Sequence, residues 1–356
     1  MAKSEGVVDA DRIQSFARRL LEVFTGSALT PLISLGYRTG LYEAATRGPA
    51  TSVELAQRAG LQERYVREWL GAMVTAGFFT FDPASGRYTF PAEHAALLTG
   101  PSARNLAPTG GIIGSVVAVL PHIERCFRDG GGVPYAAYRP AFTDGMDDLW
   151  RRIYDEQLVP GFLGAVPGLT QRLTEGASVL DIGCGTGHAV NVMAREYPLS
   201  VFAGYDISAE AIERAEAERA AMGLRNASFT VLDVAELPTD RLFDVITAFD
   251  AIHDQRAPDE VLRRVHNALG PAGEFVMVDF KFSSKLEHNV GNPFAPLCYA
   301  ISLMHCMPVS LAEDGAGLGA VWGEDMAREM LAAAGFTSVD VRDSPRPQNC
   351  IYVCRR

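Results

Sequence analysis

Residues 179–188 (VLDIGCGTGH) limit what this chain can fold into more than any other stretch. The stretch opens with an apolar run typical of a buried parallel strand. It continues with Asp181 and then places Gly183, Gly185 and Gly187 at alternate positions. Glycine has no Cβ, so such a loop can turn sharply and bring backbone N–H groups against a ligand. The pattern predicts a strand, a ligand-binding loop and the start of a helix.

The acid in this stretch indicates which ligand the loop receives. Asp181 favours a ligand that has a positive charge or hydroxyl and amino donors, and it would repel a pyrophosphate. The dinucleotide fingerprint has the spacing G-x-G-x-x-G. Here the spacing is G-x-G-x-G, and His188 stands where the third glycine is expected. A nicotinamide-dependent oxidoreductase is therefore only a distant alternative.

From Ala177 the hydrophobic pattern alternates between strands and helices, which is typical of an open parallel sheet. We therefore predict an α/β fold with a Rossmann-like sheet. A short Pro-rich turn (343–347) should pair the last two strands as an antiparallel hairpin. The predicted helices are 187–196, 208–222, 258–269 and 323–334, and the seven predicted strands are 178–182, 201–205, 228–232, 243–249, 273–279, 337–342 and 349–354.

Four acids stand at the carboxyl ends of the first four predicted strands: Asp181, Asp206, Asp233 and Asp250. Open α/β sheets bind ligands beyond these ends. Asp206 could accept both hydroxyls of a ribose, which a nicotinamide protein would also require. A single acid at such a position is often a helix cap. Four in register with a glycine loop indicate a cofactor site.

The glycine stretch resembles the first motif of class I S-adenosylmethionine-dependent methyltransferases, and the resemblance covers about residues 175–356. It implies S-adenosylmethionine as the cofactor and a seven-stranded sheet. It also implies that Asp233 binds the adenine amino group and that Val234 packs on the adenine ring. The remaining cofactor-binding residues it implies are Asp181, Gly183, Gly185, Gly187, Asp206, Ile207, Phe249 and Asp250.

Residues 249–279 are similar to small-molecule O-methyltransferases of the caffeic acid and isoflavone type, which have an N-terminal winged-helix dimerisation domain. In that family a His–Asp pair supplies the catalytic base, and the match falls on His253 and Asp254. Asp279 matches the acid that orients this histidine. The family usually has Trp at the next position, where this chain has Gln255. The alternative is that His253 caps or packs a loop.

The N-terminal segment is predicted to be mostly helical after a loose end at residues 1–9. Helices are expected at 11–24 and 31–45, followed by a helix–turn–helix–hairpin over 51–90 that is typical of a winged helix. Within 51–90 four arginines balance four acids, whereas a DNA reader normally presents a basic face. A structural or dimerising role is favoured over a ligand-responsive transcriptional regulator.

Three domains are predicted: 1–100, a helical linker at 101–170, and a methyltransferase domain at 171–356. The linker should contain a helix near 110–128, a flexible crossing and a helix at 147–163. Residues 282–322 form an insertion that could be a lid over an apolar pocket or an ordinary core segment. The predicted substrate-pocket residues are Trp150, Tyr154, His253, Asn289, Tyr299, Met304, His305 and Trp322.

His305 is a second candidate base. Its neighbour Cys306 invites a metal site, but two adjacent residues without further ligands do not make one, and no metal is predicted. The other cysteines are scattered without a C-x-x-C pair, which favours reduced thiols.

The formal net charge of −11 disfavours nucleic acid and anionic membranes as partners. The apolar run 112–123 is too short to cross a membrane, and the chain is expected to be cytoplasmic.

Taken together with the family resemblance, these features predict a homodimeric methyltransferase acting on a hydroxyl of a small, largely apolar molecule. A nitrogen or carbon acceptor is the close alternative.

Overall fold

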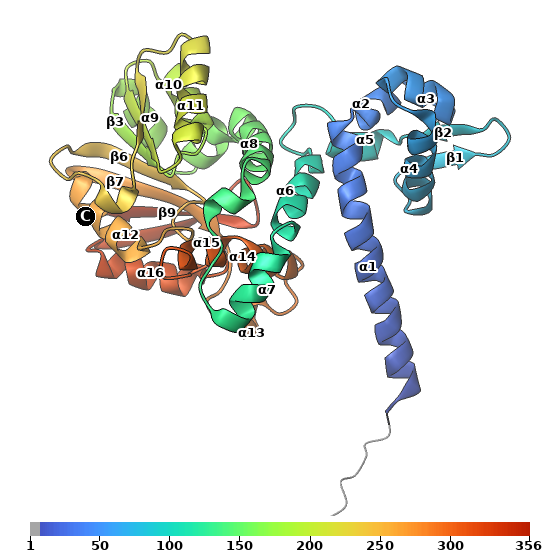
Figure 1. Ribbon diagram of the computed structural model, residues 1–356. Helices are drawn as coiled ribbons and strands as arrows, with labels where there is room; N and C mark the ends of the chain where they lie inside the picture. The colour runs from blue at the N-terminus through green and yellow to red at the C-terminus, as the bar shows by residue number, and fades with distance from the viewer. Residues whose placement is uncertain (1–7) are drawn as a thin grey trace, which may run out of the picture. The chain divides into compact units, whose positions relative to one another are not determined.

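The computed structural model describes residues 8–356. By its internal contacts the chain divides into two compact units, Met1–Gly114 and Ser115–Arg356 (Figure 1). The predicted loose end lies outside the described residues except for Val8 and Asp9, and the side chain of Asp9 caps the first helix. The predicted boundaries of a separate linker at 101–170 remain a prediction.

The first unit begins with one continuous 29-residue helix, α1 (Ala10–Arg38), where two helices were predicted. The predicted break before Pro31 was wrong. Proline inside a helix removes one backbone hydrogen bond. Here the helix continues through it, and its last turns pack against the core of the unit, where Trp69 Nε1 donates to the backbone oxygen of Leu32 at 2.9 Å.

The rest of this unit has the predicted winged-helix order. The Thr51–Glu54 capping box is present, and the β1–β2 hairpin pairs Thr80 with Thr89. Buried aromatic rings of Tyr42, Trp69 and Phe79 form the centre of the core. The elements are α2 (Leu41–Ala45), α3 (Ser52–Ala59), α4 (Glu63–Thr75), β1 (Thr80–Asp82), β2 (Arg87–Thr89), α5 (Ala92–Leu98) and α6 (Ala107–Val117).

By length and composition alone α1 is apolar enough to cross a membrane, and only 11% of its most apolar window is buried. The pair formed by α6 and α7 (Leu120–Asp129) passes the same test together but is bent by 48°. This bend replaces the single helix predicted near 110–128. The prediction that membranes are not partners stays a prediction.

The second unit is built on the predicted seven-stranded sheet, in the order β5-β4-β3-β6-β7-β9-β8. The first five of its strands in chain order are parallel neighbours, and β9 pairs antiparallel with both β7 and β8, as predicted. The strands are β3 (Ser178–Ile182), β4 (Val201–Asp206), β5 (Ala227–Val231), β6 (Phe243–Phe249), β7 (Leu269–Phe280), β8 (Ser338–Asp343) and β9 (Asn349–Arg355).

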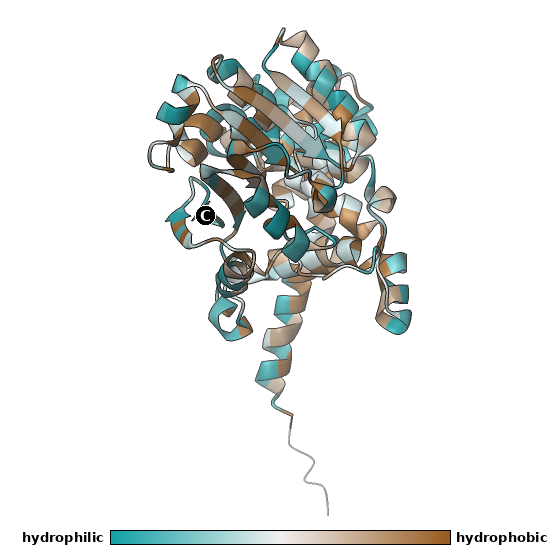
Figure 2. Ribbon diagram, turned by 90° about the vertical axis from the view of Figure 1, so that its left-hand side faces the viewer, coloured by the Kyte–Doolittle hydropathy of each residue, from teal (hydrophilic) through white to brown (hydrophobic). Residues whose placement is uncertain are grey.

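Helices cover this sheet, and the apolar strands lie inside (Figure 2). Against it pack α12 (Pro258–Ala268) and α16 (Gly323–Ala333), with Leu262 and Leu331 fully buried beside Ile246 of β6. The helices that follow β3 and β4 are α10 (His188–Glu196) and α11 (Ala209–Ala221). The predicted helices of this domain are thus present to within one or two residues.

The helix predicted at 147–163 begins earlier, as α8 (Ala141–Ile153), and continues as a π-helical stretch, η2 (Tyr154–Leu163). Before it comes the short helix η1 (Tyr135–Tyr138), and after it comes α9 (Leu169–Glu175). The segment 282–322 contains α13 (Leu286–Asn289), α14 (Ala295–Met304) and α15 (Cys306–Leu311).

Candidate functional site

A cavity of about 280 Å³ opens in the second unit, beyond the carboxyl ends of β3, β4 and β6. This is the edge at which open α/β sheets bind ligands. One side of the cavity is formed by the glycine loop and the segments that follow β4, β5 and β6. The opposite side is formed by η1, α8 and the segment 305–313. The cavity therefore joins the predicted cofactor residues to an aromatic wall.

The glycine loop is shaped by close approaches of its backbone. Gly183 has φ +65°, and a Cβ there would lie 2.7 Å from the Cβ of Ala251. Gly185 N donates to Asp206 Oδ2 at 2.8 Å, and both glycines line the cavity. Gly187 instead faces the protein interior, since a Cβ there would lie 2.4 Å from Ala215. The first two glycines form the loop wall, and the third serves packing.

Two of the four predicted acids stand on the cofactor side of the cavity, each with a hydrophobic neighbour. Asp206 accepts hydrogen bonds from the backbone at both carboxylate oxygens, and burial raises its pKa. Asp233 accepts from Ala235 N at 2.9 Å. Ile207 and Val234, which follow these acids in the sequence, also line the cavity. These four predicted residues are thus brought together at the cavity, whereas the predicted Gly187 and Asp181 do not line it.

Asp250 is the most unusual of the four acids. Its backbone has φ +56°, a region that non-glycine residues seldom occupy and that is concentrated at functional sites. Its Oδ1 is buried without a hydrogen-bond partner within residues 8–356. Burial raises the pKa of this carboxyl to about 7. Phe249 lies beside it on the cavity wall, with the Tyr154 ring 5.5 Å away.

Asp181 lies behind the loop, in the core of the sheet. Its side chain is 2% exposed and accepts a hydrogen bond from Thr247 Oγ1 at 2.6 Å. Burial raises its pKa to about 7, against the opposing effect of that hydrogen bond. Asp181 therefore acts on a ligand at most through its charge or through the loop that it precedes.

His253, which was predicted to line the substrate pocket, is not among the residues that line the cavity, whereas its neighbour Asp254 is. Its Nδ1 is 2.9 Å from Asp279 Oδ1, and its Nε2 is 3.4 Å from Asp254 Oδ1. Both His253 and Asp279 are buried. Burial disfavours a charged imidazole, but the two carboxylates outweigh burial and hold the pKa of His253 well above its usual value. The predicted His253–Asp279 pair is thus in contact.

His305 lies in the cavity wall itself. Its ring stacks on Phe142 with the ring centres 3.7 Å apart, and Tyr138 approaches it edge-on. Neither ring nitrogen has a hydrogen-bond partner in the part of the chain that the structure describes. Burial lowers the pKa of this histidine to about 4. His305 is therefore neutral at pH 7 and can offer one donor and one acceptor to a ligand.

Of the other predicted pocket residues, two line the cavity and four do not. Trp150 and Tyr154 line the cavity and stack on one another, with ring centres 5.3 Å apart. The remaining predicted pocket residues lie elsewhere, so this geometry does not support their assignment to the pocket. Trp322 packs in the sheet core, Asn289 and Tyr299 hydrogen-bond to each other, and Met304 bonds Tyr138 through its backbone.

Sequence reasoning missed most of the wall formed by residues 135–151. Tyr135, Phe142 and Met146 line the cavity, and so do Asp147 and Arg151. The only local signal was the aromatic side of the helix predicted from residue 147. Its start at Ala141 and its position over the glycine loop come from tertiary contacts.

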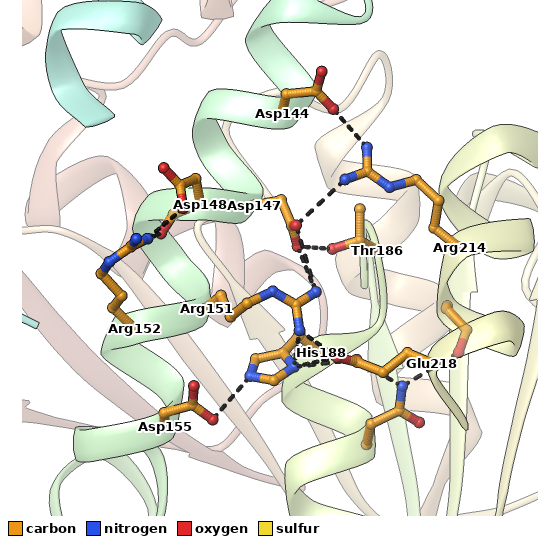
Figure 3. A network of polar contacts seen from close by, with 12 residues as sticks. Asp144, Asp147, Asp148, Arg151, Arg152, Asp155, Thr186, His188, Arg214 and Glu218 are labelled. Carbon is orange, nitrogen blue, oxygen red and sulfur yellow. Dashed lines mark hydrogen bonds and ion pairs between the residues drawn. The ribbon is translucent and has the colours of Figure 1, made fainter. Parts of the chain in front are cut away.

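A network of polar contacts ties this wall to the glycine loop (Figure 3). Asp147 of α8 accepts from Thr186 of the loop and from Arg214 of α11. Nearby, Arg151 pairs with Glu218 and contacts His188 Nδ1 at 2.8 Å. Burial would raise the pKa of Glu218, but hydrogen bonds from His188, Asn191 and Arg151 outweigh it and hold this pKa at about 2. The network fixes α8 over the loop.

The cavity fits S-adenosylmethionine because it offers carboxylates that accept hydrogen bonds and carry negative charge. Asp206 and Asp233 present carboxylates at the ends of β4 and β5, where hydroxyl and amino donors of a nucleoside can reach them. The unpartnered oxygen of Asp250 stands where a cationic group would satisfy it. A side chain at Gly183 would collide with Ala251, another residue of the cavity wall, so the loop keeps its close approach only with glycine there.

Comparisons with known proteins agree with this geometry. Residues 173–335 match the family described as "Methyltransferase domain", and residues 27–100 match the "Rv2258c-like winged HTH domain". Residues 173–335 form a class I methyltransferase domain. The predicted family resemblance, fold class and S-adenosylmethionine cofactor are thereby confirmed, and the predicted enzyme class is confirmed for this domain.

Two of the curated relatives are similar to part of this chain. The 27-O-demethylrifamycin SV methyltransferase of Amycolatopsis mediterranei (strain S699) is 32% identical over 157 residues, 39% of this chain and 56% of its own. The trans-aconitate 2-methyltransferase of Variovorax paradoxus (strain S110) is 34% identical over 128 residues, 35% of this chain and 46% of its own. The chain thus spans about half the length of these relatives.

The fold of this chain is similar to that of a solved structure over its whole length. Human N-acetylserotonin methyltransferase, solved in complex with S-adenosylmethionine, has a TM-score of 0.71 at 16% identity. The match covers 100% of this chain and 99% of the human one. At this identity the similarity shows the fold.

Proposed function

We propose that this protein transfers a methyl group from S-adenosylmethionine to a hydroxyl of a small, largely apolar molecule. The observation that supports this most is the cavity itself. It joins the acids of the cofactor side to a wall of aromatic rings that includes Tyr135, Phe142 and Trp150. Such a wall suits a flat, apolar acceptor.

Methyl transfer of this kind is an in-line displacement in which the enzyme mainly supplies orientation. S-adenosylmethionine, when bound, supplies a methyl group on a positively charged sulfur. The glycine loop, Asp206 and Asp233 would hold the nucleoside part, and Asp250 would stabilise the positive charge. The network around Asp147 would keep α8 over the loop and exclude water.

A hydroxyl acceptor must lose its proton when its oxygen bonds to the methyl carbon. We propose that the cluster of His253, Asp279 and Asp254 takes up this proton, with His253 as the general base once the positive charge of the bound cofactor has lowered its pKa. Asp279 supports the role because it fixes the imidazole through Nδ1. An amine acceptor is the alternative, since an amine needs little help from a base. In that case Asp254 on the cavity wall would bind the amine.

Calorimetric titration with S-adenosylhomocysteine, and with NADH as the control, tests the cofactor. Micromolar binding of the first compound and none of the second is expected. No binding of S-adenosylhomocysteine to folded protein would refute the proposal. A panel of phenols, amines and carboxylic acids, assayed by mass increase of one methyl group, then separates hydroxyl from nitrogen acceptors.

We also propose that the first unit makes the chain a homodimer. Several apolar side chains of α1 are exposed, among them Phe16 at 63% and Phe24 at 64%. Light scattering after size exclusion should give a mass near twice 38.4 kDa. The double substitution Phe16→Glu and Phe24→Glu should give monomers, whereas Tyr65→Glu, at an exposed position on α4, should not. A monomeric wild-type protein would show the proposal to be wrong.

The same unit is not expected to bind DNA. On α4 both arginines pair with acids of the same helix, Arg64 with Glu68 and Arg67 with Glu63. A helix neutralised in this way gives little attraction to phosphates. A gel shift with mixed-sequence duplex DNA at physiological salt would decide between this view and the regulator hypothesis.

A further inference from the structure

His253, Asp254 and Cys306 bring three different metal-ligating atoms to one point under the cavity. The imidazole nitrogen, a carboxylate oxygen and the thiol sulfur all lie within 4.8 Å of one another. His253 and Asp254 follow β6, and Cys306 begins α15, so the fold brings together segments about 50 residues apart. Cys306 is buried, and its thiol interacts with His253.

The imidazole of this cluster is already oriented as metal-binding histidines are. Metal ligands of this type donate their other ring N–H to a carboxylate or carbonyl, which fixes the ring and its tautomer. Asp279 accepts from His253 Nδ1 at 2.9 Å and is itself fully buried. Nε2 is thereby directed at Asp254 and Cys306. The ring of His253 is thus fixed by Asp279 before any metal binds.

The charge around this imidazole also calls for a cation. The imidazole lies between two carboxylates, with Asp279 Oδ1 2.9 Å from Nδ1 and Asp254 Oδ1 3.4 Å from Nε2, whereas it supplies at most one positive charge. Asp254 Oδ1 is buried and makes no hydrogen bond among the described residues, and its contact with His253 Nε2 is long, at 3.4 Å. A carboxylate oxygen so weakly satisfied costs free energy, and a cation bound between the two atoms would contact both.

His305, the sequence neighbour of Cys306, takes no part in the cluster. Its ring is turned away and stacks on Phe142. The metal site that the adjacent pair His305–Cys306 could suggest is therefore not formed. The thiol of Cys306 instead lies near His253 and Asp254, which follow β6.

We infer that His253, Asp254 and Cys306 form a binding site for a divalent transition-metal ion, for which zinc is the best match. Thiolate, imidazole and carboxylate are the ligands that zinc prefers. Three protein ligands leave one position free, as in catalytic zinc sites. Asp254 is the one of the three that lines the cavity, so we expect the free position to be reached from the space proposed for the acceptor.

This inference goes beyond the proposed methyl transfer, which in itself requires no metal. With the ion bound, Nε2 of His253 is a ligand and cannot also be the general base proposed above. In that form the ion, in place of the histidine, would assist loss of the proton by lowering the pKa of the acceptor hydroxyl. Metal content and methyl transfer are measured separately, so failure of one proposal leaves the other open to its own test.

The test uses the full chain, stripped with a chelator and desalted, and the metal alone as the probe. Titration with Co²⁺ should give one equivalent of binding, a charge-transfer band from the thiolate and the visible bands of a four-coordinate ion. Competition should show that Zn²⁺ binds more tightly than Co²⁺. Binding of Zn²⁺ should also raise the unfolding temperature, because only the folded cluster presents all three ligands.

Matched variants assign the ligands. Cys306→Ser should abolish the charge-transfer band, whereas Cys298→Ser, at a neighbouring buried cysteine on α14, should retain it. Asp279→Asn should keep the band but weaken Zn²⁺ binding by about 10- to 100-fold. If Cys306→Ser fails to fold, His253→Gln serves in its place and should abolish stoichiometric binding. Wild-type protein that binds no Co²⁺, or a band unchanged in Cys306→Ser, would overturn the inference.

Discussion

His253 Nδ1 lies 2.9 Å from a carboxylate oxygen of Asp279, and both side chains are buried under the cavity floor. The two residues are 26 positions apart and come from the ends of the neighbouring parallel strands β6 and β7. A carboxylate can only accept here, so Nδ1 holds a proton and Nε2 is the nitrogen directed at Asp254. This relationship leads to the first prediction.

Replacement of His253 by Ala, or of Asp279 by Asn, should lower kcat by about 100-fold or more, because either change removes the oriented imidazole. The dissociation constant for S-adenosylhomocysteine should change little, since neither side chain is on the cofactor side of the cavity. Steady-state kinetics with the identified acceptor and calorimetry check the two parts. Equal losses in kcat and in cofactor affinity would contradict the assignment.

Asp206 should be the acid on which cofactor affinity depends most. Asp206→Ala should weaken S-adenosylhomocysteine binding by about 10- to 100-fold, because charged hydrogen bonds to the ribose and the support of Gly185 N are both lost. Asp206→Asn should have a smaller effect because it keeps one acceptor oxygen. Calorimetric titration measures both variants, and unchanged affinity in the alanine variant would exclude this role.

Alanine substitutions at two glycines of the loop separate the cost of backbone strain from the cost of a steric collision. Gly185 and Gly187 both have positive φ, but only at Gly187 would a Cβ collide, with Ala215 and Phe229. Gly185→Ala should therefore destabilise the fold by about 1 kcal/mol from backbone strain. Gly187→Ala should cost about 3 kcal/mol, because overpacking is added. Urea unfolding of the two variants measures the difference, and equal costs would mean that the interior relaxes around the new methyl group.

The network around Glu218 should make stability depend on acidity. The pKa of Glu218 is lowered to about 2 in the fold from an ordinary 4.5. Its contribution is therefore fully present above pH 4.5 and is lost as the pH falls towards 2. Glu218→Gln should lower the free energy of unfolding at pH 7 by about 2 kcal/mol. The difference from wild type should shrink between pH 4.5 and 3, and denaturant titrations across this range would test it.

Local sequence was enough to predict the methyltransferase sheet and the cofactor side of the site. Alternation of apolar strands with amphipathic helices is a property of neighbouring residues, and it placed β3 to β9 to within a few residues. The acids Asp206, Asp233 and Asp250 could be predicted together because the carboxyl ends of parallel strands meet at one edge. The same reasoning brought His253 to Asp279.

The opposite wall was decided by tertiary packing. Phe142 and His305 are more than 160 residues apart, and only their packing turns the histidine from Cys306 towards the cavity. Trp322 seemed suited to a pocket but fills the sheet core, because burial there removes a large apolar surface from water. Whether α1 continues through Pro31 likewise depends on contacts with the rest of the unit, such as Trp69 with Leu32, and these cannot be predicted from the residues next to Pro31. Local patterns determine which elements form, and long-range burial determines which of their faces meet.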